Sequence, residues 1–112
     1  MNAKKIQPVP NPSASAMTDM VAYQAGSVVS HTILNKPSGS VTLFSFDAGE
    51  SLSEHTAPFD AMVYILDGEA LVTISGRANI LQAGETLIMP AGEPHALQAV
   101  KRFKMLLIMI KS

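Results

Sequence analysis

The sequence contains no cysteine, and only 15% of its 112 residues are charged. Without cysteine the chain has no disulfide framework, no thiolate nucleophile and no thiolate metal site. A bound metal would therefore need imidazole, carboxylate, amide or water ligands, which suit zinc, iron, nickel, copper or manganese. The formal net charge of −1 gives no electrostatic reason to bind nucleic acid or an acidic membrane, and we expect neither as a partner.

Long apolar runs and several catalytic motifs are also missing. No stretch of about 18 uncharged apolar residues is present, so we expect no segment to span a bilayer. Residues 1–12 lack the apolar stretch of about 7–15 residues that a secretory signal requires, and we expect a cytoplasmic protein. The sequence has neither a nucleophile elbow nor a loop ending in Gly-Lys-Ser/Thr, which argues against serine-hydrolase and P-loop chemistry.

Apolar residues make up 47% of the chain, which is ample material for a hydrophobic core. A chain of this length corresponds to one domain. Its seven methionines are expected mainly to fill irregular gaps in that core. Residues 1–16 differ in composition, with three prolines among asparagine and serine residues, and they are predicted to form a flexible tail. The prediction is therefore a tail followed by a single domain over residues 17–112.

Short runs rich in β-branched and apolar residues alternate with turn-forming residues at intervals of about 8–12 residues. No convincing stripe with the helical period of 3.6 residues is present. This pattern predicts an all-β fold, either a sandwich or a barrel. Asp67-Gly68 is typical of a tight turn between strands. The expected strands include residues 28–34, 41–46, 62–66, 69–74 and 103–110.

Two of these runs, residues 62–66 and residues 105–110, are apolar at every position. A strand of this kind must be covered on both of its faces. Together the two runs contain more apolar surface than the interior of one small barrel needs. We therefore expect a homodimer in which a second copy of the chain buries an outer sheet face.

Two segments of the chain combine a glycine turn with a histidine. In each, an apolar or alternating run follows the glycine, and the histidine comes six or eleven residues after it. The first segment begins at Gly49, continues through His55, Ala57 and Ala61, and reaches Gly68. The second segment comprises Gly84, Pro90, Gly92, His95 and Ala99.

With these residues and spacings, residues 40–110 resemble a small single-domain cupin. The resemblance implies an all-β jelly-roll barrel, also called a double-stranded β-helix. Many cupins bind a divalent metal, such as iron, zinc, nickel or manganese, through three histidines and a glutamate. By position in the motifs, His55 and His95 match two of these four ligands. Ala57 stands where another histidine would be, and Ala61 stands where the glutamate would be.

The preferred hypothesis is a barrel that binds a small organic molecule, with His55 and His95 as polar anchors and Ala57 and Ala61 in the pocket lining. The alternative is a metal-dependent enzyme of the oxygenase or isomerase type, in which the two histidines hold the metal and Asp60 is the candidate third ligand. A non-catalytic partner module, with its interior filled by side chains, is the third hypothesis. His31 is expected to be structural or exposed.

Overall fold

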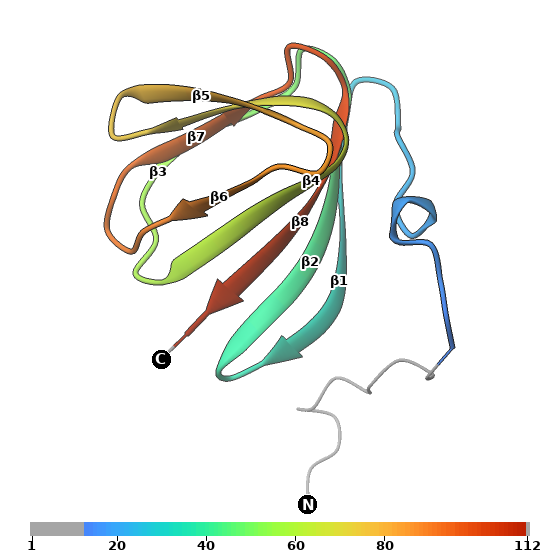
Figure 1. The fold of residues 1–112 in the computed structure, drawn as a ribbon, viewed down its shortest axis with the longest axis horizontal. Helices are drawn as coiled ribbons and strands as arrows, with labels where there is room; N and C mark the ends of the chain where they lie inside the picture. The colour runs from blue at the N-terminus through green and yellow to red at the C-terminus, as the bar shows by residue number, and fades with distance from the viewer. Residues whose placement is uncertain (1–12, 112) are drawn as a thin grey trace, which may run out of the picture.

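The computed structural model describes residues 13–111, which form a short 3-10 helix and eight β-strands (Figure 1). Residues 1–12 of the predicted tail lie outside the described residues. Within residues 13–111, no helix is long and apolar enough to cross a membrane. The elements are η2 (Met17–Asp19), β1 (Val28–Lys36), β2 (Gly39–Phe46), β3 (Ser51–His55), β4 (Asp60–Ile74), β5 (Arg77–Gln82), β6 (Thr86–Met89), β7 (His95–Gln98) and β8 (Phe103–Ile110).

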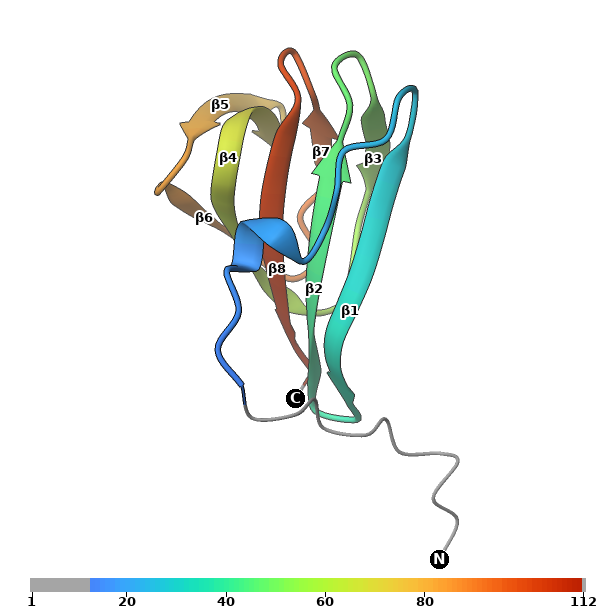
Figure 2. The same ribbon diagram turned by 90° about the vertical axis from the view of Figure 1, so that its right-hand side faces the viewer.

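The strands form an antiparallel sheet that curls over on itself (Figures 1 and 2). Its order is β1-β2-β8-β4-β7-β3, and β5 and β6 pair with β4. Strands β1, β2, β8 and β6 lie in one layer with the first half of β4, and β3, β5 and β7 lie in the other with its second half. The prediction of an all-β barrel is confirmed.

Strand β4 belongs to both layers because it changes partners near Gly68. Its first half pairs with β8 and β6, and its second half pairs with β5 and β7. The expectation of a tight turn at Asp67-Gly68 is therefore wrong. The register against β8 shifts between Ile65 and Asp67, and Gly68 has a φ of +79°. The glycine conformation bends a continuous strand here and does not reverse it, because pairing on both sides of the bend overrides the local preference for a turn.

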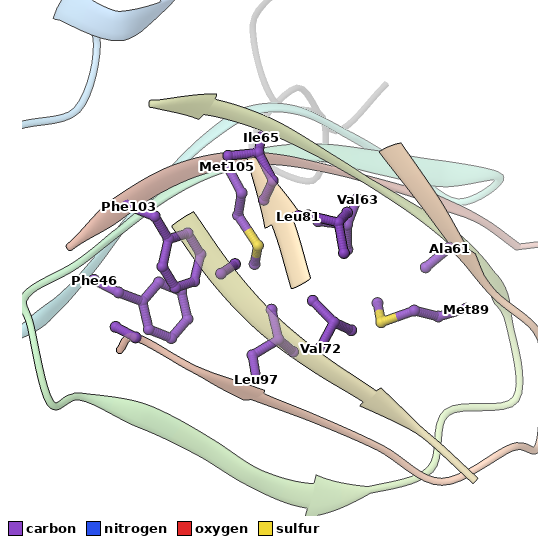
Figure 3. Close-up of a cluster of buried hydrophobic side chains, with 12 residues drawn as sticks. Phe46, Ala61, Val63, Ile65, Val72, Leu81, Met89, Leu97, Phe103 and Met105 are labelled. Atoms are coloured by element: carbon purple, nitrogen blue, oxygen red, sulfur yellow. The ribbon is translucent and has the colours of Figure 1, made fainter. Parts of the chain in front are cut away.

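The core is filled by side chains that alternate along the strands, as the strand period of two requires. Phe46 and Phe103 are fully buried and stack with their ring centroids 4.4 Å apart. Figure 3 shows this aromatic pair at one end of the buried cluster, with Ala61 and Met89 at the other. The inward-facing residues of β4 are Ala61, Val63, Ile65, Ala70 and Val72.

Residues 17–23 cross the outer face of the first layer, where η2 lies over β8 and β2 (Figure 2). The hydroxyl of Ser45 and the ammonium of Lys104 donate hydrogen bonds to backbone carbonyls of this segment. The Tyr23 hydroxyl donates to the carboxylate of Asp67 at 2.5 Å. The pKa of Tyr23 is raised above its ordinary range, mainly by burial and to a smaller extent by this hydrogen bond. These contacts fix the segment across the sheet.

Another part of the outer face is apolar and is not covered by any of residues 13–111. It contains a depression of about 270 Å³ between β4, β6 and β8. Ile88 and Ile110 border it with 55% and 57% of their surface exposed. We call this surface the outer apolar patch; its residues are Asp60, Ala61, Met62, Ile88, Ile108 and Ile110.

Candidate functional site

His55 and His95 contact each other across strands β3 and β7, where they are paired in register. Their Nε2 atoms are 3.1 Å apart, their ring centroids are 4.3 Å apart, and the ring planes meet at 68°. His95 is buried, with 6% of its surface exposed, whereas His55 is exposed. The fold thus brings together two imidazoles that are 40 positions apart in the chain, one inside the barrel and one at its surface.

A backbone carbonyl lies beside the Nδ1 atom of each ring. His55 Nδ1 lies 2.8 Å from the carbonyl oxygen of Ser53, and His95 Nδ1 lies 3.2 Å from that of Glu93. A carbonyl oxygen only accepts hydrogen bonds, so these contacts favour the tautomer in which Nδ1 carries the proton. Each neutral ring then has its lone pair on Nε2, and these two lone pairs face each other. A contact of 3.1 Å between them is favourable only with a proton, a metal ion or a ligand donor to share.

A cavity of about 70 Å³ lies beside the imidazole pair. Its wall is apolar apart from the two rings, and both alanines of the first histidine segment border it. The small alanine side chains leave this space open. The lining residues are Phe44, Leu52, His55, Ala57, Ala61, Met89, His95, Leu97, Met105, Leu107 and Met109.

The loop before β7, which presents His95, is held by contacts to the loop after β3. The Gly92 N–H donates to the carbonyl of Ala57 at 2.8 Å. Gly92 has a φ of +79°, a conformation that favours glycine. The carboxylate of Asp60 accepts a hydrogen bond from the Ala91 N–H at 2.9 Å. Asp60 is thus a positioning residue for the loop that carries His95.

The donor set does not fit the divalent metal of the alternative hypothesis. Zinc and non-haem iron sites generally take at least three protein ligands, including a carboxylate in most iron sites. Residues 13–111 contain no group of three histidine or acidic side chains that could hold a metal ion. The structure does not bring Asp60 to the imidazoles, because Asp60 is bonded to the loop and does not line the cavity. Ala57 and Ala61 offer no donor atoms.

The sequence analysis missed the methionines of the cavity. In the register of β4, Ala61 lies opposite Met89 of β6 and also opposite Met109 of β8. Both methionines border the cavity, as does Met105. Because side chains alternate along a strand, Met105 and Met109 lie on the same face of β8. The sequence alone shows that they share a face, but it does not show that this face turns inward.

The family model for the cupin domain matches residues 42–111 of the chain. The chain belongs to the cupin family. The match begins in β2 and continues past the end of β8, so it includes both histidine segments and every strand that borders the imidazole pair. The resemblance drawn from the glycine and histidine spacings is confirmed. No curated protein matches this cupin.

Several solved structures share the fold of this cupin. A conserved protein of unknown function from Streptococcus pyogenes is 36% identical, with a TM-score of 0.89 over 96% of this chain and 94% of that one. A cupin superfamily protein from Desulfitobacterium hafniense is 29% identical, with a TM-score of 0.88 over 96% and 98% of the two chains. A cupin 2 conserved barrel domain protein from Leptotrichia buccalis is 43% identical, with a TM-score of 0.82 over 85% of this chain and 46% of that one.

Proposed function

We propose that this cupin binds a small organic molecule inside its barrel, with His55 and His95 as the polar anchors. The observation that supports the proposal is the pair of facing Nε2 atoms on the wall of an otherwise apolar cavity. An apolar lining with a few convergent polar groups is the usual architecture of a ligand site. Because both Nε2 atoms are acceptors in the neutral rings, the ligand should carry a hydroxyl or another hydrogen-bond donor.

The cavity also limits the size of the ligand. A water molecule needs about 10–15 Å³ of such a space, so a cavity of about 70 Å³ takes on the order of five non-hydrogen atoms. Pockets for drug-sized ligands are larger, at about 300–1,000 Å³. Small alcohols, short carboxylic acids in the protonated form and small diketones in the enol form meet both the size limit and the need for a donor.

Ligand-observed NMR with a panel of such compounds tests the proposal on the untagged protein. We expect at least one compound to bind, and His55→Ala to weaken its binding by about fivefold to tenfold, because the ligand loses an acceptor worth about 1–1.5 kcal/mol. His55 is exposed, so the substitution should leave the fold intact, which its melting temperature checks.

His31→Ala is the matched control, since His31 is an exposed histidine of β1 that does not border the cavity. It should leave ligand affinity unchanged. The proposal is wrong if no compound of the panel binds, or if the binding of a compound is the same in the wild type and in His55→Ala.

We also propose that two copies of this cupin associate through the outer apolar patch. The patch is almost free of polar surface, and two of its isoleucines are more than half exposed in the single chain. Sedimentation velocity at tens of micromolar should show a homodimer, and Ile88→Lys should shift it to the monomer, because a charge would be buried in the interface. Ile80→Lys, which changes an isoleucine 65% exposed on β5 outside the patch, should remain dimeric. A wild-type monomer would contradict the proposal.

A further inference from the structure

Two methionines flank Ala61 beside the imidazole pair. Ala61 lies directly opposite Met89 on one side and Met109 on the other. Residues paired in this way have Cβ atoms about 4.5–5.5 Å apart. Both methionines line the cavity that His55 and His95 also border. Ala61 lines the same cavity, and its methyl group takes up little of the space.

The donor atoms of this cavity are soft or intermediate, and all are uncharged. Thioether sulfur is a soft ligand that selects copper(I), and imidazole nitrogen also suits copper. The hydrogen bonds from Nδ1 to backbone carbonyls orient both rings with Nε2 free, which is the arrangement that metal-bound histidines usually have. No carboxylate lines the cavity. The set therefore differs from the hard, carboxylate-containing sites that iron and manganese use.

The spacing of the rings indicates how many ligands a metal ion here would need. With metal–nitrogen bonds of about 2.0 Å, an Nε2 separation of 3.1 Å corresponds to an angle of about 100° at the metal. A linear two-coordinate ion would hold the nitrogens about 4 Å apart, at the same bond length. The observed pair therefore fits a three- or four-coordinate ion, and the side chains of the cavity are the protein groups that can complete its coordination.

Charge also favours a monovalent ion. Burying a charge in an apolar cavity is costly unless a counter-charge accompanies it. The cost grows with the charge of the ion, and this lining has no anionic group to offset it. A monovalent ion surrounded by uncharged nitrogen and sulfur donors is the least costly metal occupant of the cavity.

We propose that the cavity is a copper(I) site, in which His55 and His95 bind the ion through Nε2 and Met89 or Met109, or both, complete its coordination through sulfur. The inference does not depend on the organic ligand proposed above. Copper(I) and such a ligand would use the same Nε2 lone pairs, so each should exclude the other.

Anaerobic titration of the untagged protein with copper(I), in competition with the colorimetric chelator bicinchoninate, tests the proposal. We expect one equivalent to bind, and a Met89→Leu Met109→Leu variant to bind at least tenfold more weakly. Leucine replaces methionine with little change in volume, so the variant should fold, and its melting temperature checks this. X-ray absorption of the copper-loaded wild type should show sulfur as well as nitrogen around the ion.

Met62→Leu is the matched control, because Met62 borders the outer apolar patch and not the cavity. It should bind copper(I) as the wild type does. The proposal is overturned if bicinchoninate removes all copper from the wild type, if the double variant binds equally well, or if only nitrogen and oxygen surround the ion. It is also overturned if zinc(II) binds the wild type more tightly than copper(I). NMR with the organic panel is a separate measurement, so either proposal can fail alone.

Discussion

Replacing Gly68 with alanine is expected to lower the free energy of unfolding by about 2–5 kcal/mol. Gly68 has a φ of +79°, and an alanine in this region of backbone space costs about 1–2 kcal/mol. A Cβ at this position would also overlap the carbonyl oxygen of Arg102, which is backbone and cannot rotate away. Relieving that overlap must displace β4 from β8, at a cost of about 1–3 kcal/mol. Because small domains are stable by about 5–15 kcal/mol, this loss is large.

Gly76→Ala separates the two contributions. Gly76 has nearly the same φ, +80°, but a Cβ there would meet no atom within 4 Å. Its substitution should cost only the backbone term of about 1–2 kcal/mol. Urea denaturation of both variants measures the difference. If the two substitutions lower the free energy of unfolding equally, the close approach of Gly68 to the backbone of Arg102 does not restrict residue 68 to glycine.

Restoring the two missing donors is expected to create a divalent metal site. Ala57→His together with Ala61→Glu would place a third imidazole and a carboxylate on the wall of the cavity that already contains His55 and His95. Four ligands, one of them anionic, would complete the coordination of a divalent metal ion, which His55 and His95 alone do not. We expect zinc or manganese affinity to rise by more than tenfold, about 1.4 kcal/mol or more. Isothermal titration of the untagged wild type and variant measures the change.

Ala57→His together with Ala61→Gln is the control for the carboxylate. Glutamine has nearly the same shape as glutamate but no charge, so this pair should bind the metal more weakly than the glutamate variant. If the histidine–glutamate variant folds and gains no metal affinity, the two alanine positions do not point toward a common centre with the imidazoles.

The sequence predicted the fold well wherever local chemistry and tertiary pairing agree. The sequence predicts turns at Gly49 and Gly84, and both residues have positive φ. Asp67-Gly68 was misread because an Asp-Gly pair has the same local preference in a hairpin turn and in a bulge. Only the pairing of β4 with strands on both sides of Gly68 distinguishes the two, and that pairing involves residues distant in the chain.

For the site, the resemblance to cupins implied that His55 and His95 would lie close together, because both occupy ligand positions of the family's motifs. The environment of Asp60 was not predictable. The direction of its side chain depends on how the bend before β4 sets the register of the strand, and the sequence does not determine this. Asp60 caps the Ala91 N–H instead of facing the imidazoles. The contacts of the two Nδ1 atoms with the carbonyl oxygens of Ser53 and Glu93 were equally unpredictable, because they depend on the local path of the backbone.

The path of β4 through both layers has a consequence for how the domain opens. A single strand of 15 residues provides the pairing surface for β5, β6, β7 and β8, so both layers lose a pairing partner when β4 unfolds as a whole. Backbone amides along the whole of β4 should therefore exchange with deuterium at one common slow rate, set by global unfolding. Since these partners are distant in sequence, refolding should be slow compared with that of helical domains of equal length.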